Sequence, residues 1–294
     1  MKREKKFQRK YVGLLVMILL CFTLVSGCNM SGEKEQEGTE VEKISSKRVG
    51  EDTREKSDSI EQEANAQVEQ FEQDVESTED FNSYQDQKMI VIDAGHQAEG
   101  NSEQEPIGPG ADKTKDKVSS GTSGCVSGID EYELTLELSL KLQKKLIDKG
   151  YQVVMVRTRN DVDISNAERA EVANRVGADA FVRIHANGSE DSSVEGAMTI
   201  CQTPDNPYNG DLYEESKRLS ENILDELVEK TDCNKQYVWE TDSMSGINWC
   251  QVPVSIVEVG YMSNPEEDAL LATEEYQEKV VEGIAKGIKK YLSE

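Results

Sequence analysis

The sequence has few basic residues for its length. Its 294 residues include 33 Lys and Arg against 58 Asp and Glu, which gives a net charge of −25. Removal of residues 1–27, which hold six basic residues and one acidic residue, brings the net charge to −30. Binding to nucleic acid depends on contacts from Lys and Arg to phosphates, so this balance argues against a nucleic-acid partner. It also argues against attachment to anionic lipid through a basic patch.

Cysteine is scarce as well. Apart from Cys21 and Cys28, the sequence has Cys125, Cys201, Cys233 and Cys250. Their spacing matches no zinc-ribbon pattern, which argues against that class of structural zinc site. Disulfides form in proteins outside the cytoplasm. A Cys201–Cys250 bridge, a Cys125–Cys250 bridge and four free thiols are the alternatives that the sequence leaves open.

The N-terminus holds an apolar run that is short for a membrane span. Residues 12–25 follow a basic start, whereas a spanning helix needs about 20 apolar residues, so a secretion signal is predicted. The segment Leu24–Cys28 resembles a bacterial lipoprotein signal, in which cleavage leaves a lipid-bearing cysteine at the N-terminus. We expect residues 1–27 to be removed and Cys28 to anchor the chain to the outer face of the cytoplasmic membrane. The alternative is an uncleaved anchor helix, and either arrangement places the remaining chain outside the cytoplasm.

Residues 28–87 have too little apolar surface to offset the entropy of ordering. They are dominated by Glu, Gln, Ser, Lys and Asp, which predicts a mostly disordered acidic tether. One stretch has apolar residues at helical spacing, from Ile60 through Val68 to Val75. It is interpreted as transient helix in a solvated tether, and the alternative is a short helix that docks on the domain or self-associates.

From Lys88 onward, strand and helix patterns alternate. Strands are expected at residues 89–93, 151–157, 179–184, 196–201 and 252–259, and helices near 131–149, 165–176, 211–230 and 274–292. This alternation predicts one α/β domain, residues 88–294, with a mostly parallel central sheet flanked by helices. Residues 134–142 alternate with a period of two, but their Leu, Glu and Lys residues favour a helix.

Histidine is the scarcest residue type that carries chemistry. The only two histidines, His96 and His185, each follow a strand-like apolar run. A third run, residues 252–259, contains Glu258, a carboxylate that is costly to bury without a partner. Ligands of open α/β sheets bind at the carboxyl ends of the strands, so we expect these three side chains to converge on one site.

Two histidines and one carboxylate form a common ligand set of catalytic zinc sites, which keep a fourth position for water. The acid could be Glu131, Glu133 or Glu258. Asp130 followed by Glu133 has the form of a capping box, in which Glu133 turns back to the helix start. Glu131 then projects from the first helical position, so we assign Glu131 as the ligand and Glu258 as the general base that activates water.

The same residues match a known family. The segments Ile90–His96, Ile184–Asn187 and Val257–Pro265, with Glu131 at a helix start, resemble the zinc-dependent N-acetylmuramoyl-L-alanine amidases. The stretch Thr158–Asp161, followed by Arg169 and Asn174, resembles them too. The resemblance covers residues 88–293 in the right order.

The resemblance implies a peptidoglycan hydrolase with one zinc ion per chain. Such an enzyme cleaves the amide between N-acetylmuramic acid and the L-alanine of the stem peptide. It further implies that His96, Glu131 and His185 bind zinc and that Glu258 transfers the proton. A histidine ligand needs an acceptor for its second ring nitrogen, and we expect Asp93 in that role because it lies near His96 in the sequence. The alternatives are a zinc peptidase that acts on stem peptides and a catalytically silent wall-binding lipoprotein.

The sequence departs from the family pattern beside the first histidine. Members commonly have a proline and Gly-Gly there, where this chain has Ala94, Gln97 and Ala98. Arg183 stands where many members have Ser. We expect these changes to leave the metal ligands intact, whereas the substrate contacts of this region stay open. The segment 202–251 contains one strong helix pattern, which belongs to the basic fold, so no inserted helix is expected to block the site.

Overall fold

The computed structural model of this protein describes residues 87–294. The predicted signal at 1–27, the lipidation site Cys28 and nearly all of the predicted tether lie outside the described residues.

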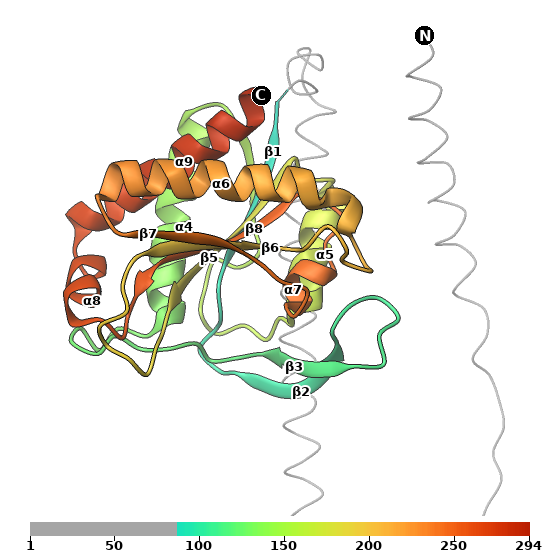
Figure 1. Cartoon of the computed structure of the whole chain (residues 1–294), viewed down its shortest axis with the longest axis horizontal. Helices are drawn as coiled ribbons and strands as arrows, with labels where there is room; N and C mark the ends of the chain where they lie inside the picture. The colour runs from blue at the N-terminus through green and yellow to red at the C-terminus, as the bar shows by residue number, and fades with distance from the viewer. Residues whose placement is uncertain (1–86) are drawn as a thin grey trace, which may run out of the picture. The chain divides into compact units, whose positions relative to one another are not determined.

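The centre of the domain is a sheet of six strands in the order β4-β1-β5-β8-β6-β7. Figure 1 shows this sheet between the helices. The strands are β1 Met89–Ala94, β4 Gln152–Met155, β5 Ala180–Asn187, β6 Ala197–Cys201, β7 Lys235–Glu240 and β8 Val254–Tyr261. β1, β4, β5 and β8 are mutually parallel, whereas β6 is antiparallel to β8 and parallel to β7. The prediction of a mostly parallel sheet is therefore confirmed.

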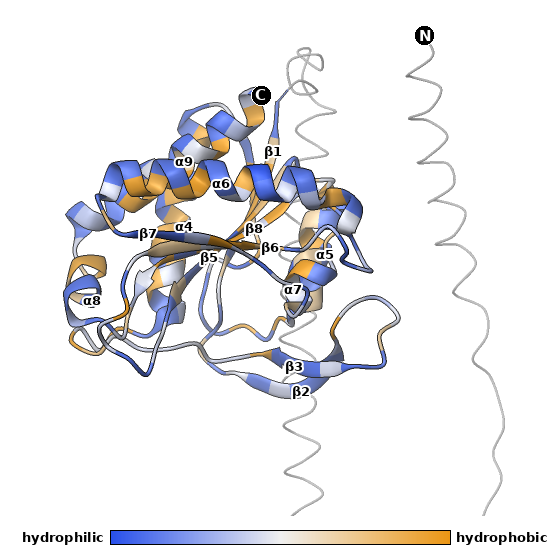
Figure 2. Ribbon diagram, in the orientation of Figure 1, coloured by the Kyte–Doolittle hydropathy of each residue, from blue (hydrophilic) through white to orange (hydrophobic). Residues whose placement is uncertain are grey.

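Helices cover both faces of this sheet. They are α4 Glu131–Asp148, α5 Asn166–Val176, α6 Tyr213–Thr231, α7 Ser245–Asn248, α8 Pro265–Leu271 and α9 Glu274–Ser293, with a 3-10 turn η1 at Gly210–Leu212. Apolar residues of α4, α6 and α9 pack on the face that carries Ile90 and Ile184, and those of α5 and α7 pack on the face that carries Val91 and Phe181. Figure 2 shows the apolar side of α6 turned toward the sheet. Both faces are buried, which explains why the strands read as continuous apolar runs.

The main elements were predicted close to their observed positions, and residues 134–142 are helical within α4 as expected. Surface elements were missed. The long loop after His96 contains an antiparallel hairpin of β2 Asn101–Pro106 and β3 Thr114–Val118. β7, at the edge of the main sheet, was also missed. β2 and β3 are built mostly from polar residues, and most side chains of all three strands are exposed or half-buried, so these strands lack the apolar pattern that marks a buried strand.

Of the alternatives left open for the four domain cysteines, the structure has free thiols. Cys201 and Cys250 are buried, and Cys125 is exposed, with no disulfide among the four. Among residues 87–294, no helix combines the length and the apolarity that crossing a membrane would require.

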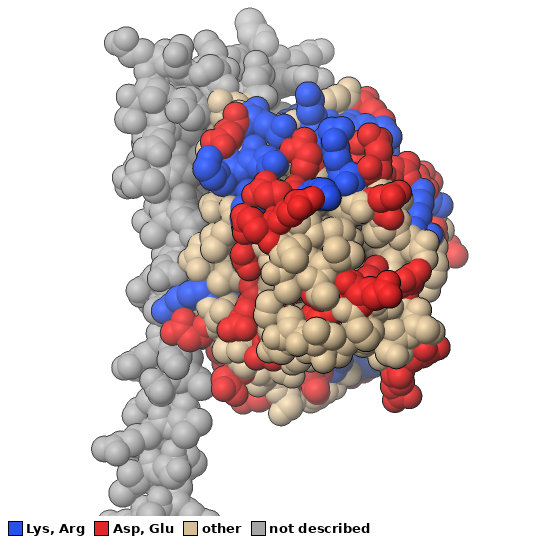
Figure 3. Space-filling model, turned by 90° about the vertical axis from the view of Figure 1, so that its left-hand side faces the viewer, with Lys and Arg blue, Asp and Glu red and all other residues tan. Residues whose placement is uncertain are grey.

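Charged side chains pair across the outer surface of the helices. Lys141 Nζ lies 2.6 Å from a Glu274 oxygen and Lys145 Nζ lies 2.8 Å from a Glu282 oxygen, which links α4 to α9. On the face shown in Figure 3, most basic side chains gather at the top among acidic ones, and acidic and uncharged side chains cover most of the rest. Exposed ion pairs of this kind contribute little stability, so the apolar core holds these helices together.

Candidate metal centre

The two histidines and Glu258 meet at the carboxyl ends of three adjacent strands. His185 in β5 lies directly opposite Glu258 in β8. His96 follows β1, the other neighbour of β5, and the amide of Gly95 donates to the carbonyl of Ile184 at 2.9 Å. His96 has a φ of +61°, a backbone conformation that residues other than glycine rarely adopt. This conformation turns the chain away from the sheet immediately after the strand.

The start of α4 supplies the third ligand-type side chain. The backbone amide of Asp130 donates to Glu133 Oε2 at 3.4 Å, in the capping box expected from the sequence. Glu131, the first residue of the helix, is buried and points at the histidines. Its two oxygens also accept the amides of Thr122 at 3.0 Å and Ala186 at 3.1 Å, so its orientation is fixed from two sides.

The three ligand atoms form a nearly equilateral triangle. Glu131 Oε1 lies 3.0 Å from His96 Nε2 and 3.2 Å from His185 Nδ1, and the two nitrogens are 3.1 Å apart. A tetrahedral zinc ion with ligand distances near 2.0–2.1 Å requires ligand atoms about 3.3 Å apart. The described residues thus contain a His–Glu–His group that could hold a metal ion.

The proton positions suit metal binding. His96 Nδ1 lies 2.9 Å from the carbonyl of Ser119, which can only accept, so we place the proton on Nδ1 and the lone pair of Nε2 toward the site. Burial opposes ionisation of Glu131, but the adjacent imidazoles of His185 and His96 outweigh it and hold the pKa of this carboxyl well below its usual range. Burial lowers the pKa of His185 to about 4. Glu131 is therefore ionised and His185 neutral at pH 7, the states that metal binding requires.

Glu258 lies in the same pocket in a different state. Burial, together with the charge of Glu131, raises the pKa of Glu258 to about 8. Its Oε2 is buried and has no hydrogen-bond partner within the described residues. A carboxyl group in this state can hold a proton near neutral pH and is open to a partner from outside the protein.

The pocket measures about 520 Å³ and depends on two glycines. A methyl group at Gly95 would lie 2.5 Å from the imidazole of His185, and one at Gly121 would lie 2.7 Å from Glu131 Oε2. Gly121 also has a φ of +83°. Apart from the ligands and Glu258, much of the lining is uncharged and polar, including Ser119, Thr122, Asn187, Ser189 and Ser263.

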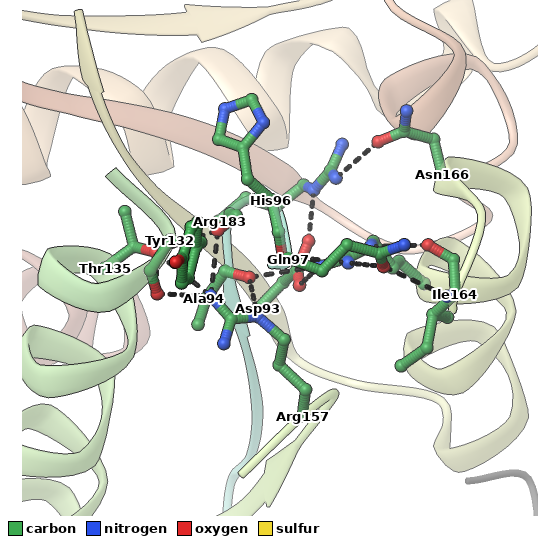
Figure 4. Close-up of polar contacts among 12 residues, drawn as sticks. Asp93, Ala94, His96, Gln97, Tyr132, Thr135, Arg157, Ile164, Asn166 and Arg183 are labelled. Atoms are coloured by element: carbon green, nitrogen blue, oxygen red, sulfur yellow. Dashed lines mark hydrogen bonds and ion pairs between the residues drawn. The ribbon is translucent and has the colours of Figure 1, made fainter. Parts of the chain in front are cut away.

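The prediction that Asp93 supports a histidine ligand is wrong. Asp93 is fully buried, and its two oxygens bind Arg169 at 2.7 Å and Arg183 at 2.8 Å (Figure 4). In strand β1 its side chain points away from the ring of His96, whose partner is the carbonyl of Ser119. Burial opposes ionisation of Asp93, but the two guanidinium groups hold its pKa at about 2. No sequence signal marks Ser119, because its acceptor is a backbone atom in an irregular loop.

Two of the residues that depart from the family pattern, Gln97 and Arg183, also lie away from the pocket. Gln97 is fully buried, and its Oε1 accepts from Arg169 at 2.8 Å and from the amide of Ile164 at 3.0 Å. Arg183 binds Asp93 and donates to Asn166 Oδ1 at 2.8 Å. Gln97 and Arg183 therefore form part of a buried network beneath the site (Figure 4).

Comparisons with known proteins agree with this geometry. Residues 90–290 match the family model described as N-acetylmuramoyl-L-alanine amidase. The chain is 28% identical over 214 residues to the N-acetylmuramoyl-L-alanine amidase Rv3717 of Mycobacterium tuberculosis, a match that covers 70% of this chain and 86% of that protein. It is 30% identical over 207 residues to the uncharacterized protein YqiI of Bacillus subtilis, with 70% and 86% covered.

Solved structures show the same fold. The crystal structure of the N-acetylmuramyl-L-alanine amidase Ami1 from Mycobacterium smegmatis matches with a TM-score of 0.64 and 27% sequence identity. That match covers 70% of this chain and 97% of Ami1. The family model spans well over half of the sequence, in agreement with the resemblance identified from His96, Glu131 and His185. The chain therefore belongs to the N-acetylmuramoyl-L-alanine amidase family of peptidoglycan hydrolases.

Proposed function

We propose that this protein hydrolyses the amide between N-acetylmuramic acid and the L-alanine of the stem peptide, with a zinc ion held by His96, Glu131 and His185. The observation that carries the proposal is the triangle of ligand atoms, with edges of 3.0–3.2 Å. Its two nitrogens and one carboxylate oxygen match a donor set of catalytic zinc sites. The low pKa values of Glu131 and His185 keep both groups free of competing protons at pH 7.

When bound, zinc supplies a Lewis acid that polarises the scissile carbonyl and makes water more acidic. The protein's own contribution to proton transfer is Glu258, whose carboxyl lines the same pocket. Glu258 accepts a proton from the attacking water as the new C–O bond forms, then delivers it to the leaving nitrogen as the C–N bond breaks. Its pKa of about 8 lets the group work in both directions near neutral pH.

The pocket wall suits a peptide-like substrate. Hydroxyl groups of Thr122 and Ser263 and the amide of Asn187 line it. Uncharged donors and acceptors of this kind bind amide groups and sugar hydroxyls without the desolvation of a charged side chain. We infer that these groups orient the amide for attack beside Glu258.

Digestion of purified peptidoglycan followed by mass analysis of the products tests the reaction. An amidase releases intact stem peptides and leaves glycan strands free of peptide. Release of single terminal amino acids would instead identify a zinc peptidase. Intact peptidoglycan after incubation with zinc-loaded protein would favour a silent wall-binding lipoprotein.

We also propose that lipid on Cys28 holds the protein at the outer face of the cytoplasmic membrane, with residues 28–87 as a tether. The support is the sequence Leu24–Cys28 and the acidic composition that follows it. A substrate in the cell wall requires action outside the cytoplasm, which agrees with this placement.

A further inference from the structure

The segments that carry the three proposed ligands are joined at a single residue, Gly95. Its amide donates to the carbonyl of Ile184, the residue before His185. Its carbonyl accepts from Thr135 Oγ1 at 2.8 Å and from Arg157 Nη2 at 2.9 Å. Thr135 lies one turn beyond Glu131 in α4, so these bonds connect the exit of β1 to both β5 and α4.

Arg157 binds two ligand-bearing segments with one guanidinium group. Its Nε donates to the carbonyl of Ala94 at 2.8 Å, and its Nη2 reaches the carbonyls of Gly95 at 2.9 Å and Tyr132 at 2.8 Å. Gly95 precedes His96, and Tyr132 follows Glu131. Only 3% of Arg157 is exposed, and Figure 4 shows its guanidinium between the end of β1 and the start of α4.

The backbone held by these bonds is one that does not form readily by itself. His96 has a φ of +61°, and its carbonyl accepts from Arg169 Nη2 at 3.0 Å. The left-handed conformation is unfavourable for a residue with a side chain, so it persists only where surrounding contacts impose it. The direction of the His96 imidazole therefore depends on how the carbonyls of residues 94–96 are held.

We propose that Arg157 and Thr135 are positioning residues for the metal site. Both donate hydrogen bonds to the carbonyl of Gly95, Thr135 from α4 and Arg157 from the loop after β4. These bonds set the distance between His96 and Glu131. Neither side chain lines the pocket, so each acts through the ligands and not on the substrate. The inference rests on the proposed function, because it assigns these two residues to the site that would hold zinc.

The geometry of the guanidinium distinguishes it from a simple positive charge. Arg157→Lys keeps the charge, but an ammonium group lacks the planar, fixed arrangement of donors with which the guanidinium binds three carbonyls. Thr135→Val keeps the shape of the side chain and removes the hydroxyl that binds Gly95. A matched control is Arg159→Lys in the same loop, where the Arg159 side chain is 38% exposed and lies 3.8 Å from Asp161.

The test is zinc affinity, measured by competition with a chelator on purified wild-type protein and each variant. Loss of a group that orients a metal ligand lowers metal affinity by about 10- to 100-fold, so we expect the zinc affinity of Arg157→Lys to fall by a factor in this range. The zinc affinity of Thr135→Val should fall by less than that of Arg157→Lys, and Thr135→Ser should bind zinc as tightly as the wild type. Arg159→Lys should bind as wild type. The absorption spectrum of Co²⁺ bound in place of zinc should change in Arg157→Lys and Thr135→Val, which a general loss of stability would not produce.

Two results have different meanings. If the wild type binds no zinc, the proposed function fails. If the wild type binds zinc and folded Arg157→Lys and Thr135→Val bind it equally tightly, with an unchanged Co²⁺ spectrum, the positioning role is overturned while the proposed function stands. Should Arg157→Lys fail to fold, the comparison of Thr135→Val with Thr135→Ser decides.

Discussion

Glu131 and Glu258 line one pocket, but the pKa of Glu131 is lowered and the pKa of Glu258 is raised. Both are removed from water, which alone would raise the pKa of each. Two imidazoles contact Glu131 and reverse the effect, whereas Glu258 has no such partner and is exposed to the charge of Glu131. The environment thus separates a carboxylate that can bind a cation from a carboxyl group that can carry a proton.

The raised pKa of Glu258 predicts that replacing this carboxyl with an uncharged amide stabilises the protein, and that the gain depends on pH. In the metal-free protein, this pKa rises on folding from 4.5 to about 8. Ionisation of Glu258 therefore opposes folding progressively as the pH rises through this range. Glu258→Gln should raise the free energy of unfolding by a few kcal/mol at pH 8 and leave it unchanged below pH 4.

Calorimetric unfolding of both proteins in the presence of a chelator measures this difference. A stability gain that is the same at pH 4 and pH 8 would show that the effect has another cause than ionisation.

Gly95 should tolerate no side chain. In Gly95→Ala the new methyl group would lie 2.5 Å from the His185 ring, so the imidazole must move out of the ligand triangle. We expect zinc affinity to fall by about 10-fold or more. Gly110→Ala, whose methyl group meets nothing within 4 Å but whose φ is +76°, is the control for backbone strain without a clash at the site. Equal zinc affinity in Gly95→Ala and wild type would mean that His185 is not held in this position.

The site could be predicted only in part at the level of residues. His96, His185 and Glu258 follow apolar strands, so the rule that ligands bind at strand ends brought them together. Asp93 was assigned by its closeness to His96 in sequence, but the alternation of side chains along β1 points it into the interior. Arg157 and Gln97 could not be assigned, because their partners are backbone carbonyls and amides whose positions depend on the tertiary fold.

One carboxylate at the start of helix α4 faces the site, and another caps the N-terminus of the helix. Glu131 and Glu133 are two residues apart, and only Glu131 faces the histidines. Glu131→Gln should abolish tight zinc binding with the fold retained. Glu133→Ala should cost about 1 kcal/mol of stability through the weakened cap and leave zinc stoichiometry at one per chain.

Zinc content and thermal unfolding of the two variants distinguish these roles. If Glu133→Ala lost zinc and Glu131→Gln retained it, the predicted register of α4 at the site would be wrong.

The elements that were predicted share a strong apolar pattern, and those that were missed do not. α9 packs against α6 and α4 and shows helical periodicity. The hairpin of β2 and β3 is built from sequences such as Asn101–Pro106, in which only Glu105 is buried. Pairing of these strands depends on backbone hydrogen bonds, which leave no trace in the order of apolar and polar residues.

At the scale of the whole chain, Cys28 is expected to decide where the protein resides. Cys28→Ala removes the acceptor for lipid, so the variant should be released from the membrane fraction with its catalytic activity intact. Membrane and soluble fractions probed for the protein give the answer. Persistent membrane attachment of the variant would support the uncleaved N-terminal anchor instead.

Zinc content of the purified protein tests the central claim most directly. Elemental analysis should give one zinc per chain for the wild type and for Glu258→Ala, and none for His185→Ala. Glu258→Ala should be inactive despite its zinc, because its pocket has lost the group that transfers the proton. Absence of zinc from the wild type, or full zinc occupancy in His185→Ala, would contradict a metal site built from His96, Glu131 and His185.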